Sequence, residues 1–365
     1  MNEDYYMRRA LRLARRGMGQ VSPNPMVGAV IVNDGDIVGE GAHLKYGEAH
    51  AEIAALRMAG DKAGGATLYV NLEPCCHHGK TPPCTDAITK AGIQRVVIGM
   101  VDPNPMVNRR GAEVLKAHGI AVSTGVMEDA CTELNRAFVK FITTGRPYIT
   151  AKMAMTMDGR IASKSGHSKW ITSIDARTFA HRLRAENDAV LVGLGTVRKD
   201  DPSLTVRHSR GVNPYRIVLD EDLQISPEST LLNDEHVAKT IIVTTRRSRD
   251  SEDRIIGKGA QVWFCEANSE GLIDPDALAS KVAEANMSSV LIEGGAAVNT
   301  SFLKYGCIDR LVMIYAPKIL GEGISAIGDL GILSVDRAIS LSGLKIKRLP
   351  PDVAIIADVC YQEDN

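Results

Sequence analysis

The sequence has few aromatic residues, almost no net charge and no long apolar run. Phe, Trp and Tyr make up 4% of its 365 residues, and the formal net charge is −1. A nucleic-acid-binding protein usually has a basic surface with aromatic stacking platforms, so we expect no nucleic-acid partner. No apolar run is long enough to span a bilayer, and residues 1–16 lack the apolar segment of a secretory signal. These absences predict a cytoplasmic protein with a small-molecule substrate and no membrane partner.

The number of cysteines predicts the redox compartment, and the length of the chain predicts the number of domains. The seven cysteines form an odd set without a repeating framework, which is typical of a reducing compartment. The chain is long enough for two domains. Gly145 and Pro147 are stop signals after a helix expected at 130–142. We therefore expect domains at 1–145 and 147–365, and the short linker between them favours a homo-oligomer in which the domains pack against each other or against a second subunit.

Two short segments predict a catalytic zinc site. His50, Cys75 and Cys84 offer one imidazole and two thiolates, and a tetrahedral zinc held by three such ligands keeps its fourth position for water. The metal lowers the pKa of that water from 15.7 to about 7. Glu52, two residues after the histidine, is placed to move protons. This pattern is the signature of zinc deaminases that act on nucleobase-like rings.

A purely structural zinc is the alternative interpretation of the same residues. Such a site normally needs four protein ligands. Near the two cysteines the only further candidates are Cys76, His77 and His78.

Alternating apolar strands and amphipathic helices predict an α/β fold in both halves. Cys75 lies just beyond the end of a strand expected at 66–72, and α/β proteins build their sites at such ends. In the second half, Gly193 follows a strand at 188–192, but no third glycine follows at the spacing of a dinucleotide-binding fold. Gly294 and Gly295 separate a strand from a helix, which exposes N–H groups to an anion. The alternative for that pair is a tight turn only.

Both halves resemble one enzyme family. Eight residues separate Cys75 from Cys84, and this long loop resembles the deaminase half of bifunctional riboflavin-biosynthesis deaminase–reductases. Residues 148–162 and 192–207 resemble the reductase half. The resemblance covers residues 1–360. It implies a cytidine-deaminase-like α/β sandwich followed by a dihydrofolate-reductase-like α/β domain.

The resemblance also implies two reactions, two cofactors and a set of contacts. A zinc-dependent hydrolytic deamination of 2,5-diamino-6-(5-phosphoribosylamino)pyrimidin-4(3H)-one precedes an NADPH-dependent reduction of the ribosyl group to ribityl. The residues that match substrate contacts in the deaminase are Asn24, His43, His77 and Lys80. Those that match substrate contacts in the reductase are Ser168, Arg184, Leu204, Arg207 and Glu293. Those that match contacts with NADPH are Ala154, Trp170, Gly193, Thr196, Asp200, Gly294 and Gly295, and we assign the 2′-phosphate to Thr244.

Other interpretations remain open at this stage. Taken alone, Asn24 is a turn residue between prolines, His43 is a surface histidine, and the two arginines are ordinary surface residues. The whole chain could be a deaminase of free nucleobases or nucleosides with a non-catalytic regulatory second domain, which NADPH oxidation with the deaminated pyrimidine would exclude. It could also be a zinc-dependent nucleic-acid-binding protein, although the basic stripe of such proteins is missing.

Overall fold

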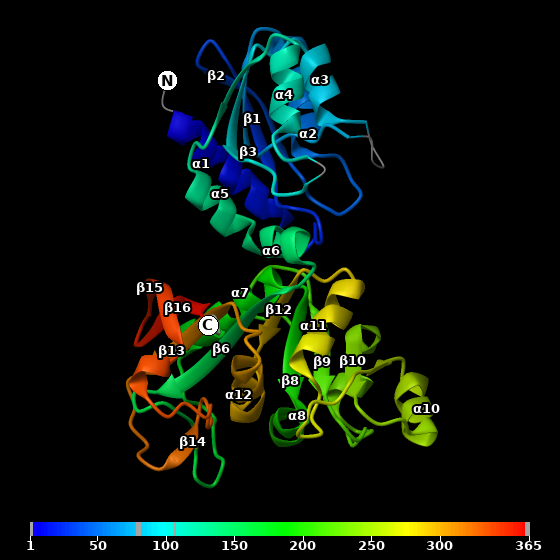
Figure 1. The fold of residues 1–365 in the computed structure, drawn as a ribbon, viewed down its shortest axis with the longest axis vertical. Coiled ribbons are helices and arrows are strands. Elements are labelled where there is room, and N and C mark those ends of the chain that lie inside the picture. Colours follow the sequence, from blue (N-terminus) through cyan, green and yellow to red (C-terminus); the bar gives the residue numbers. More distant parts are fainter. Residues whose placement is uncertain (1–2, 78–81, 106, 362–365) are drawn as a thin grey trace. The chain divides into compact units, whose positions relative to one another are not determined.

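The computed structural model describes residues 3–77, 82–105 and 107–361 (Figure 1). It divides the chain into two compact units, Met1–Arg146 and Pro147–Asn365. Each unit has its own sheet and its own buried core. Lys80, one of the expected substrate contacts, lies outside the described residues.

The first unit is built on a five-stranded sheet in the order β2-β1-β3-β4-β5. β1 is antiparallel to β2 and β3, whereas β3, β4 and β5 run parallel. The strands are β1 (Gly28–Asn33), β2 (Asp36–Ala42), β3 (Thr67–Leu72), β4 (Arg95–Met100) and β5 (Ala121–Thr124). The parallel strands have their carboxyl ends at one edge of the sheet, where an α/β protein places its functional residues.

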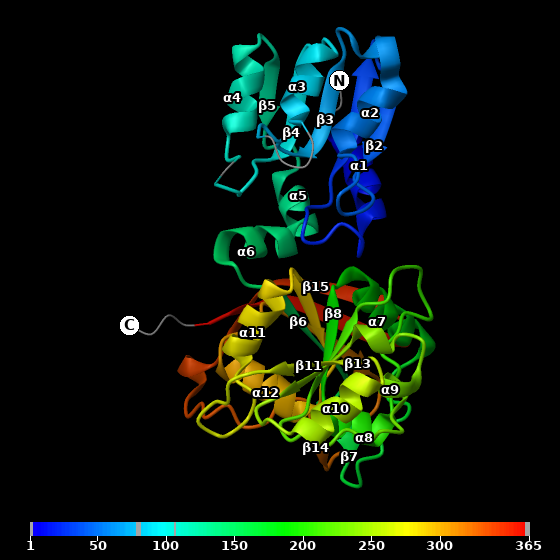
Figure 2. The same ribbon diagram turned by 90° about the vertical axis from the view of Figure 1, so that its right-hand side faces the viewer.

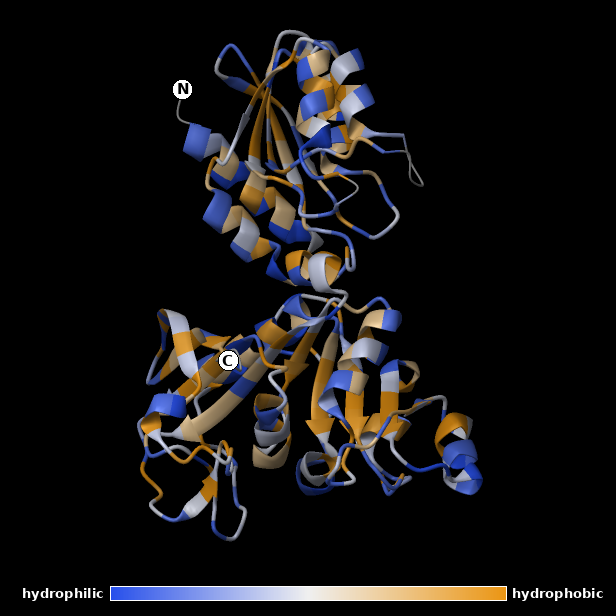
Figure 3. Ribbon diagram, viewed as in Figure 1, coloured by the Kyte–Doolittle hydropathy of each residue, from blue (hydrophilic) through white to orange (hydrophobic). Residues whose placement is uncertain are grey.

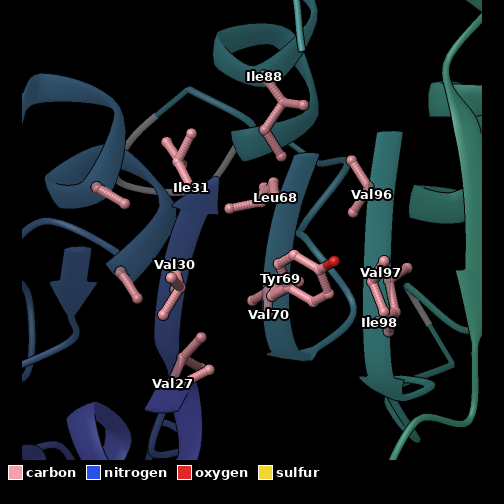
Figure 4. Close-up of a cluster of buried hydrophobic side chains, with 14 of the residues drawn as sticks. Val27, Val30, Ile31, Leu68, Tyr69, Val70, Ile88, Val96, Val97 and Ile98 are labelled. Carbon is pink, nitrogen blue, oxygen red and sulfur yellow. The ribbon is translucent and has the colours of Figure 1, made fainter. Parts of the chain in front are cut away.

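Helices cover both faces of this sheet, which makes the unit an α/β sandwich (Figures 1 and 2). One face carries α1 (Glu3–Ala14) and α5 (Glu128–Leu134), and the other carries α2 (Ala51–Ala59), α3 (Cys84–Lys90) and α4 (Arg110–Ala117). Apolar side chains from β1, β3 and β4 fill the core, and Ile88 of α3 packs over them (Figure 4).

Close packing fixes the start of α2 against the sheet. A Cβ added at Gly41 of β2 would lie 2.0 Å from the Ala51 carbonyl oxygen. Only glycine therefore lets the first turn of α2 approach β2 this closely. This approach sets the position of His50, which is the N-cap residue of α2.

The helix expected at 130–142 is in fact two helices, which corrects the prediction. α5 ends at Leu134, and α6 (Arg136–Thr144) follows after Asn135. Asn135 leaves the helical conformation, with φ −103° and ψ 17°. Its amide accepts from the Met26 N–H at 2.8 Å and donates to the Met26 carbonyl at 3.1 Å. These hydrogen bonds to a distant segment explain the break.

The second unit is built on a nine-stranded sheet in the order β11-β10-β9-β8-β12-β6-β13-β16-β15. Its strands run parallel from β11 to β13, and β16 and β15 are antiparallel additions at one end. The strands are β6 (Tyr148–Thr156), β8 (Ala189–Gly193), β9 (Tyr215–Leu219), β10 (Thr240–Thr244), β11 (Gln261–Phe264), β12 (Ser289–Ile292), β13 (Arg310–Ala316), β15 (Ser340–Leu349) and β16 (Asp352–Cys360). A separate two-stranded sheet pairs β7 (Arg160–Ser163) with β14 (Gly323–Ser325).

The central parallel strands of the large sheet are buried on both faces, as a parallel sheet requires. In β8, Ala189 and Leu191 pack into one core cluster, while Val190 and Val192 pack into another. Figure 3 shows apolar residues concentrated in the central strands. The helices are α7 (Ile174–Glu186), α8 (Leu194–Asp200), α9 (Thr230–Asn233), α10 (Arg249–Gly257), α11 (Pro275–Glu284) and α12 (Ala296–Lys304). Within the described ranges, no helix combines the length and the apolar character needed to cross a membrane.

Candidate active sites

Three elements of the first unit bring the expected zinc ligands together. His50 caps α2, Cys75 follows the end of β3, and Cys84 is the first residue of α3. The backbone N–H of Thr85 donates to the Cys75 carbonyl at 3.2 Å, so the start of α3 is held beside the end of β3. Residues separated by up to 34 positions thereby share one site.

The spacing of the three ligand atoms fits a zinc ion. His50 Nδ1 lies 3.3 Å from Cys84 Sγ and 3.6 Å from Cys75 Sγ, and all three atoms lie within 4.8 Å of one another. Zn–N and Zn–S bonds of about 2.1 and 2.3 Å at a tetrahedral angle separate nitrogen from sulfur by about 3.6 Å. The donor set and its geometry therefore match a three-ligand zinc site.

The electrostatics of the site favour a thiolate at Cys75. The hydrogen bond from the Cys84 thiol lowers the pKa of Cys75 to about 4 against the opposing effect of burial, and His50 acts in the same direction. The same hydrogen bond raises the pKa of Cys84 and, together with burial, keeps that thiol protonated in the absence of metal. A metal displaces the remaining thiol proton, because a ligating cysteine is deprotonated.

Glu52 lies inside the first turn of α2 with a side chain suited to proton transfer. The residue is 3% exposed. Burial, followed by the charge of Cys75, raises the pKa of Glu52 to about 7, although His50 opposes the shift. A carboxyl group with a pKa close to the working pH can both accept and return a proton.

A cavity of about 370 Å³ opens beside these residues. Its lining includes five of the side chains expected from the sequence besides Cys75, namely Asn24, His43, His50, Glu52 and His77. Cys84 is buried behind this lining, at 1% exposure. The cavity also has residues that the sequence interpretation did not assign: Tyr46, Glu48, Glu73, Asp102, Asn104, Phe138 and Phe141. The two phenylalanines come from α6, and only their helical spacing could have indicated an inward face.

His43 and Asn24 are ordered by hydrogen bonds rather than left on the surface. His43 is 3% exposed, its Nδ1 lies 3.1 Å from the Ala49 carbonyl, and its Nε2 lies 3.3 Å from Asn24 Nδ2. The carbonyl fixes the Nδ1–H tautomer, so Nε2 accepts from the Asn24 amide. Burial also lowers the pKa of His43, which favours the neutral ring.

The second unit brings Gly193, Glu293 and Gly294 to the carboxyl ends of β8 and β12. β12 pairs in parallel with both β8 and β6. Gly193 ends β8, and Glu293 follows β12. A Cβ on Gly193 would lie 3.0 Å from Val298 of α12, and one on Gly294 would lie 2.8 Å from it. The two strand ends and the first turn of α12 are therefore in close contact.

The start of α12 fits an anionic part of a dinucleotide. Gly295 is its N-cap residue and makes no side-chain capping hydrogen bond. The N–H groups of a first helical turn carry partial positive charge and bind phosphate oxygens well. A Cβ on Gly295 would lie 3.9 Å from Thr196 Oγ1, so the Thr196 hydroxyl adjoins the same turn.

Glu293 is the centre of a buried ion cluster. Its side chain is 7% exposed, and its carboxylate lies 2.9 Å from Lys152 Nζ. Arg184 binds it with both arms of the guanidinium, at 2.5 and 3.1 Å. Burial alone would raise the pKa of Glu293, but the cations of Arg184 and Lys152 lower it well below its ordinary value. The carboxylate is therefore ionised and held in one orientation.

These contacts leave the Arg184 expectation open and correct the one for Thr244. Arg184 also donates from Nη1 to the Thr205 carbonyl at 3.0 Å, so three of its five N–H groups bind partners among the described residues and the other two can still serve a ligand. Thr244 ends β10 but is fully buried, and its hydroxyl is bonded to the backbone oxygens of Glu221 and Arg246 at 2.7 and 3.0 Å. It cannot contact a cofactor phosphate in this arrangement.

The other expected reductase residues differ in exposure. Ala154 lies on β6 and is half-buried, and Trp170 is 65% exposed with the Arg177 guanidinium 4.2 Å above its ring. Leu204 is buried and has φ +53°, so only its backbone can reach a ligand. Three further positions are half-buried, Ser168, Thr196 and Asp200, and Arg207 is exposed. Asp200 faces Lys169 at 3.5 Å.

Lys152 and His181 were missed from the sequence. Lys152 stands alone as a charged residue within an apolar strand, which could have drawn attention to it. His181 is buried in α7, and its Nδ1 accepts the backbone N–H of Arg207 at 3.0 Å. Nothing in the local sequence predicts that contact.

Comparison with known proteins matches each half of the chain to a different family model. Residues 1–100 match the model of the cytidine and deoxycytidylate deaminase zinc-binding region, and residues 147–355 match that of the RibD C-terminal domain. The riboflavin biosynthesis protein RibD of Aquifex aeolicus is 47% identical over 352 residues, covering 96% of each chain. That of Escherichia coli is 40% identical over 374 residues, covering 97% of this chain and 99% of its own.

Solved structures agree with this relationship. Acinetobacter baumannii RibD superposes with a TM-score of 0.87 at 35% identity, covering 98% of this chain and 99% of its own. A diaminohydroxyphosphoribosylaminopyrimidine deaminase/5-amino-6-(5-phosphoribosylamino)uracil reductase from Thermotoga maritima gives 0.85 at 37% identity, with the same coverage. The cytidine-deaminase-like and reductase folds expected from the sequence are thereby confirmed. The chain belongs to the RibD family of riboflavin biosynthesis proteins, and it is a bifunctional enzyme with a zinc-dependent deaminase and an NADPH-dependent reductase.

Proposed function

We propose that residues 1–145 deaminate 2,5-diamino-6-(5-phosphoribosylamino)pyrimidin-4(3H)-one, and that residues 147–365 reduce the ribosyl group of the product. The observation that carries the first assignment is the cavity that joins Glu52 to the three-ligand cluster. The second rests on the ion cluster of Glu293 beside the open start of α12.

In the deaminase site, His50, Cys75 and Cys84 would hold the zinc, and Glu52 would handle the protons. Bound zinc supplies a Lewis acid that makes hydroxide available near neutral pH. Glu52 accepts a proton at its carboxylate and returns it to the 2-amino nitrogen, which leaves as ammonia while the water oxygen takes its place on the ring. The raised pKa of Glu52 suits both steps.

The pyrimidine would lie in the cavity between Glu52 and the loop that carries Asn24. The Asn24–His43 pair presents polar groups in a fixed orientation there. His77 Nδ1 is buried and has no hydrogen-bond partner among the described residues, so a ring substituent can satisfy it. Lys80 remains our expected contact for the substrate phosphate.

In the reductase site, bound NADPH would supply the hydride for C1′ of the ribosyl group. Gly193, Gly294 and Gly295 let the backbone approach the pyrophosphate, with Thr196 adjoining. Ala154, Trp170 and Asp200 stay our proposed contacts with the cofactor. Ser168, Arg184, Leu204, Arg207 and Glu293 stay our proposed contacts with the substrate, and Arg184 also holds Glu293.

A coupled assay tests the proposed function. The purified enzyme, given the diaminopyrimidine and NADPH, should release one ammonia per substrate and then oxidise one NADPH. Ammonia release without any NADPH oxidation would point to a deaminase with a regulatory second domain. A lack of ammonia release from zinc-loaded protein would contradict the deaminase assignment.

We propose further that the enzyme works as a homo-oligomer in the cytoplasm. β15 is at the end of the nine-stranded sheet, and its Leu344 and Ile346 are 61% and 73% exposed. Exposed apolar edge strands pair with other chains unless they are protected. Pairing with a second copy would cover this edge, and light scattering should give a mass above 39.3 kDa.

A further inference from the structure

Alternate residues at the end of β3 serve three different parts of the deaminase site. Asn71 lies in β3, and Glu73 and Cys75 follow just beyond its end. Asn71 accepts the Gly28 N–H at 2.7 Å and donates to the Met26 carbonyl at 3.0 Å. Cys75 belongs to the zinc cluster. Glu73 has no assigned role in either reaction.

Glu73 is a buried carboxylate that binds three backbone N–H groups. One carboxylate oxygen accepts from Asp102 at 3.1 Å and from Arg109 at 3.0 Å, and the other accepts from Ala112 at 3.0 Å. The residue is only 3% exposed. These bonds hold both Asp102 and the start of α4 against Glu73, the residue that precedes Pro74.

The segment that Glu73 ties down is in close contact with the loop that leads to the zinc ligand. A Cβ added at Gly111, in the first turn of α4, would lie 2.2 Å from the Pro74 carbonyl oxygen and 3.2 Å from the Glu73 carboxylate. The start of α4 therefore rests against the Glu73–Pro74 backbone. A shift of the start of α4 would displace the Glu73–Pro74 backbone, and the reverse also holds, because packed interiors transmit strain.

The same segment forms part of the substrate cavity. Asp102, Asn104 and Val107 line it together with Glu52 and His77. Asp102 is 7% exposed, and its Oδ1 accepts the Asn104 N–H at 2.9 Å, which shapes the loop further. Glu73 thus connects the wall of the cavity to the stretch between the end of β3 and Cys75.

We propose that Glu73 is a positioning residue of the deaminase, which holds the wall formed by Asp102, Asn104 and Val107 at the correct distance from the zinc cluster. This inference rests on the proposed deaminase function. Glu73 acts through the backbone N–H groups of Asp102, Arg109 and Ala112 and does not move protons. Its loss should therefore weaken substrate binding more than it slows the chemical step.

The alternative is that Glu73 only caps α4. A carboxylate near a helix N-terminus stabilises the helix, and the N–H groups of Arg109 and Ala112 belong to that terminus. The bond to Asp102 is different, since Asp102 lies eight positions before the helix and lines the cavity. An experiment must therefore separate the capping of α4 from the placement of the wall.

The test compares Glu73→Gln with Glu113→Gln in the full-length, zinc-loaded enzyme. Gln keeps the shape of Glu73 but turns one acceptor oxygen into a donor, so at least one of the three N–H groups loses its partner. Glu113 is an exposed acid in the first turn of the same helix, and its change removes one negative charge without touching the wall. Zinc content, deaminase kcat and KM, and reductase rate with pre-deaminated substrate are measured for each.

We expect Glu73→Gln to retain one equivalent of zinc and its reductase rate, while its deaminase KM rises at least tenfold and kcat changes less than threefold. Glu113→Gln should match the wild type in all four quantities. Equal kinetics for the two variants, a loss of zinc, or a fall confined to kcat in Glu73→Gln would each overturn the proposal. The proposed function itself fails only if the wild-type enzyme does not deaminate the diaminopyrimidine.

Discussion

The two sites are assembled in different ways. In the deaminase site, the metal-binding atoms of three residues lie within 4.8 Å of one another, and those residues come from two short stretches of sequence. In the reductase site, the groups around Glu293 come from β6, α7 and the end of β12, so the Arg184–Glu293 pair spans 109 positions. A site that is compact in sequence can be assigned atom by atom, whereas a dispersed one is defined only by its tertiary contacts.

The largest expected effect is a loss of zinc from the deaminase site, and it is tested by comparing substitutions of Cys84 and Cys76. Cys84→Ser should lose most of its zinc and all measurable deamination, because serine cannot replace a thiolate ligand in the cluster. Cys76→Ser is the matched control and should retain one equivalent of zinc. Metal analysis after dialysis measures both. Zinc loss in the Cys76 variant would mean that the ligand assignment is wrong.

A smaller effect, on the reductase KM, is expected when the proposed substrate contact of Arg207 is removed. Arg207→Ala should raise the reductase KM for the substrate by about 10- to 100-fold, since a charge-assisted hydrogen bond contributes about 1.5–3 kcal/mol. Deamination should continue at the wild-type rate. Arg210→Ala removes an exposed cation from the same loop and serves as the control. An unchanged KM in the Arg207 variant would remove this residue from the substrate site.

The smallest expected effect is a pH dependence of stability in the second unit. Burial, assisted by the nearby Arg184, Arg207 and His208, lowers the pKa of His181 from 6.5 to about 4. Between pH 6.5 and 4, His181 is protonated in the unfolded state but stays neutral in the folded state. The free energy of unfolding therefore falls as pH decreases from about 6.5 towards 4.

His181→Gln keeps a hydrogen-bond acceptor for the Arg207 N–H but cannot titrate. Melting temperatures measured between pH 7 and 4 should therefore fall less steeply for this variant than for the wild type. Parallel curves for the two proteins would show that His181 does not contribute to the acid sensitivity.

The sequence predicted what depends on local spacing. The His-x-Glu pattern, the two cysteines and the strand ends of both sheets are short-range features, and they lie where the residue pattern placed them. The family resemblance then supplied the two folds, both cofactors and the two activities.

The sequence could not predict what depends on distant partners. The break between α5 and α6 comes from the bonds of Asn135 to Met26, which is 109 positions away. In the sequence Thr244 is at the end of a strand, where a ligand could reach it. In the structure its hydroxyl donates to the backbone carbonyl of Glu221 instead.

The most direct test of the account is whether the two activities can be separated within one intact chain. Glu52→Gln should keep its zinc and lose at least 10²–10⁴-fold in deamination, because the proton-transfer group is gone while its shape remains. Given pre-deaminated substrate, the same protein should oxidise NADPH at close to the wild-type rate. Loss of NADPH oxidation in this variant, with zinc still bound, would show that the two sites are coupled and would contradict the division of labour between the two units.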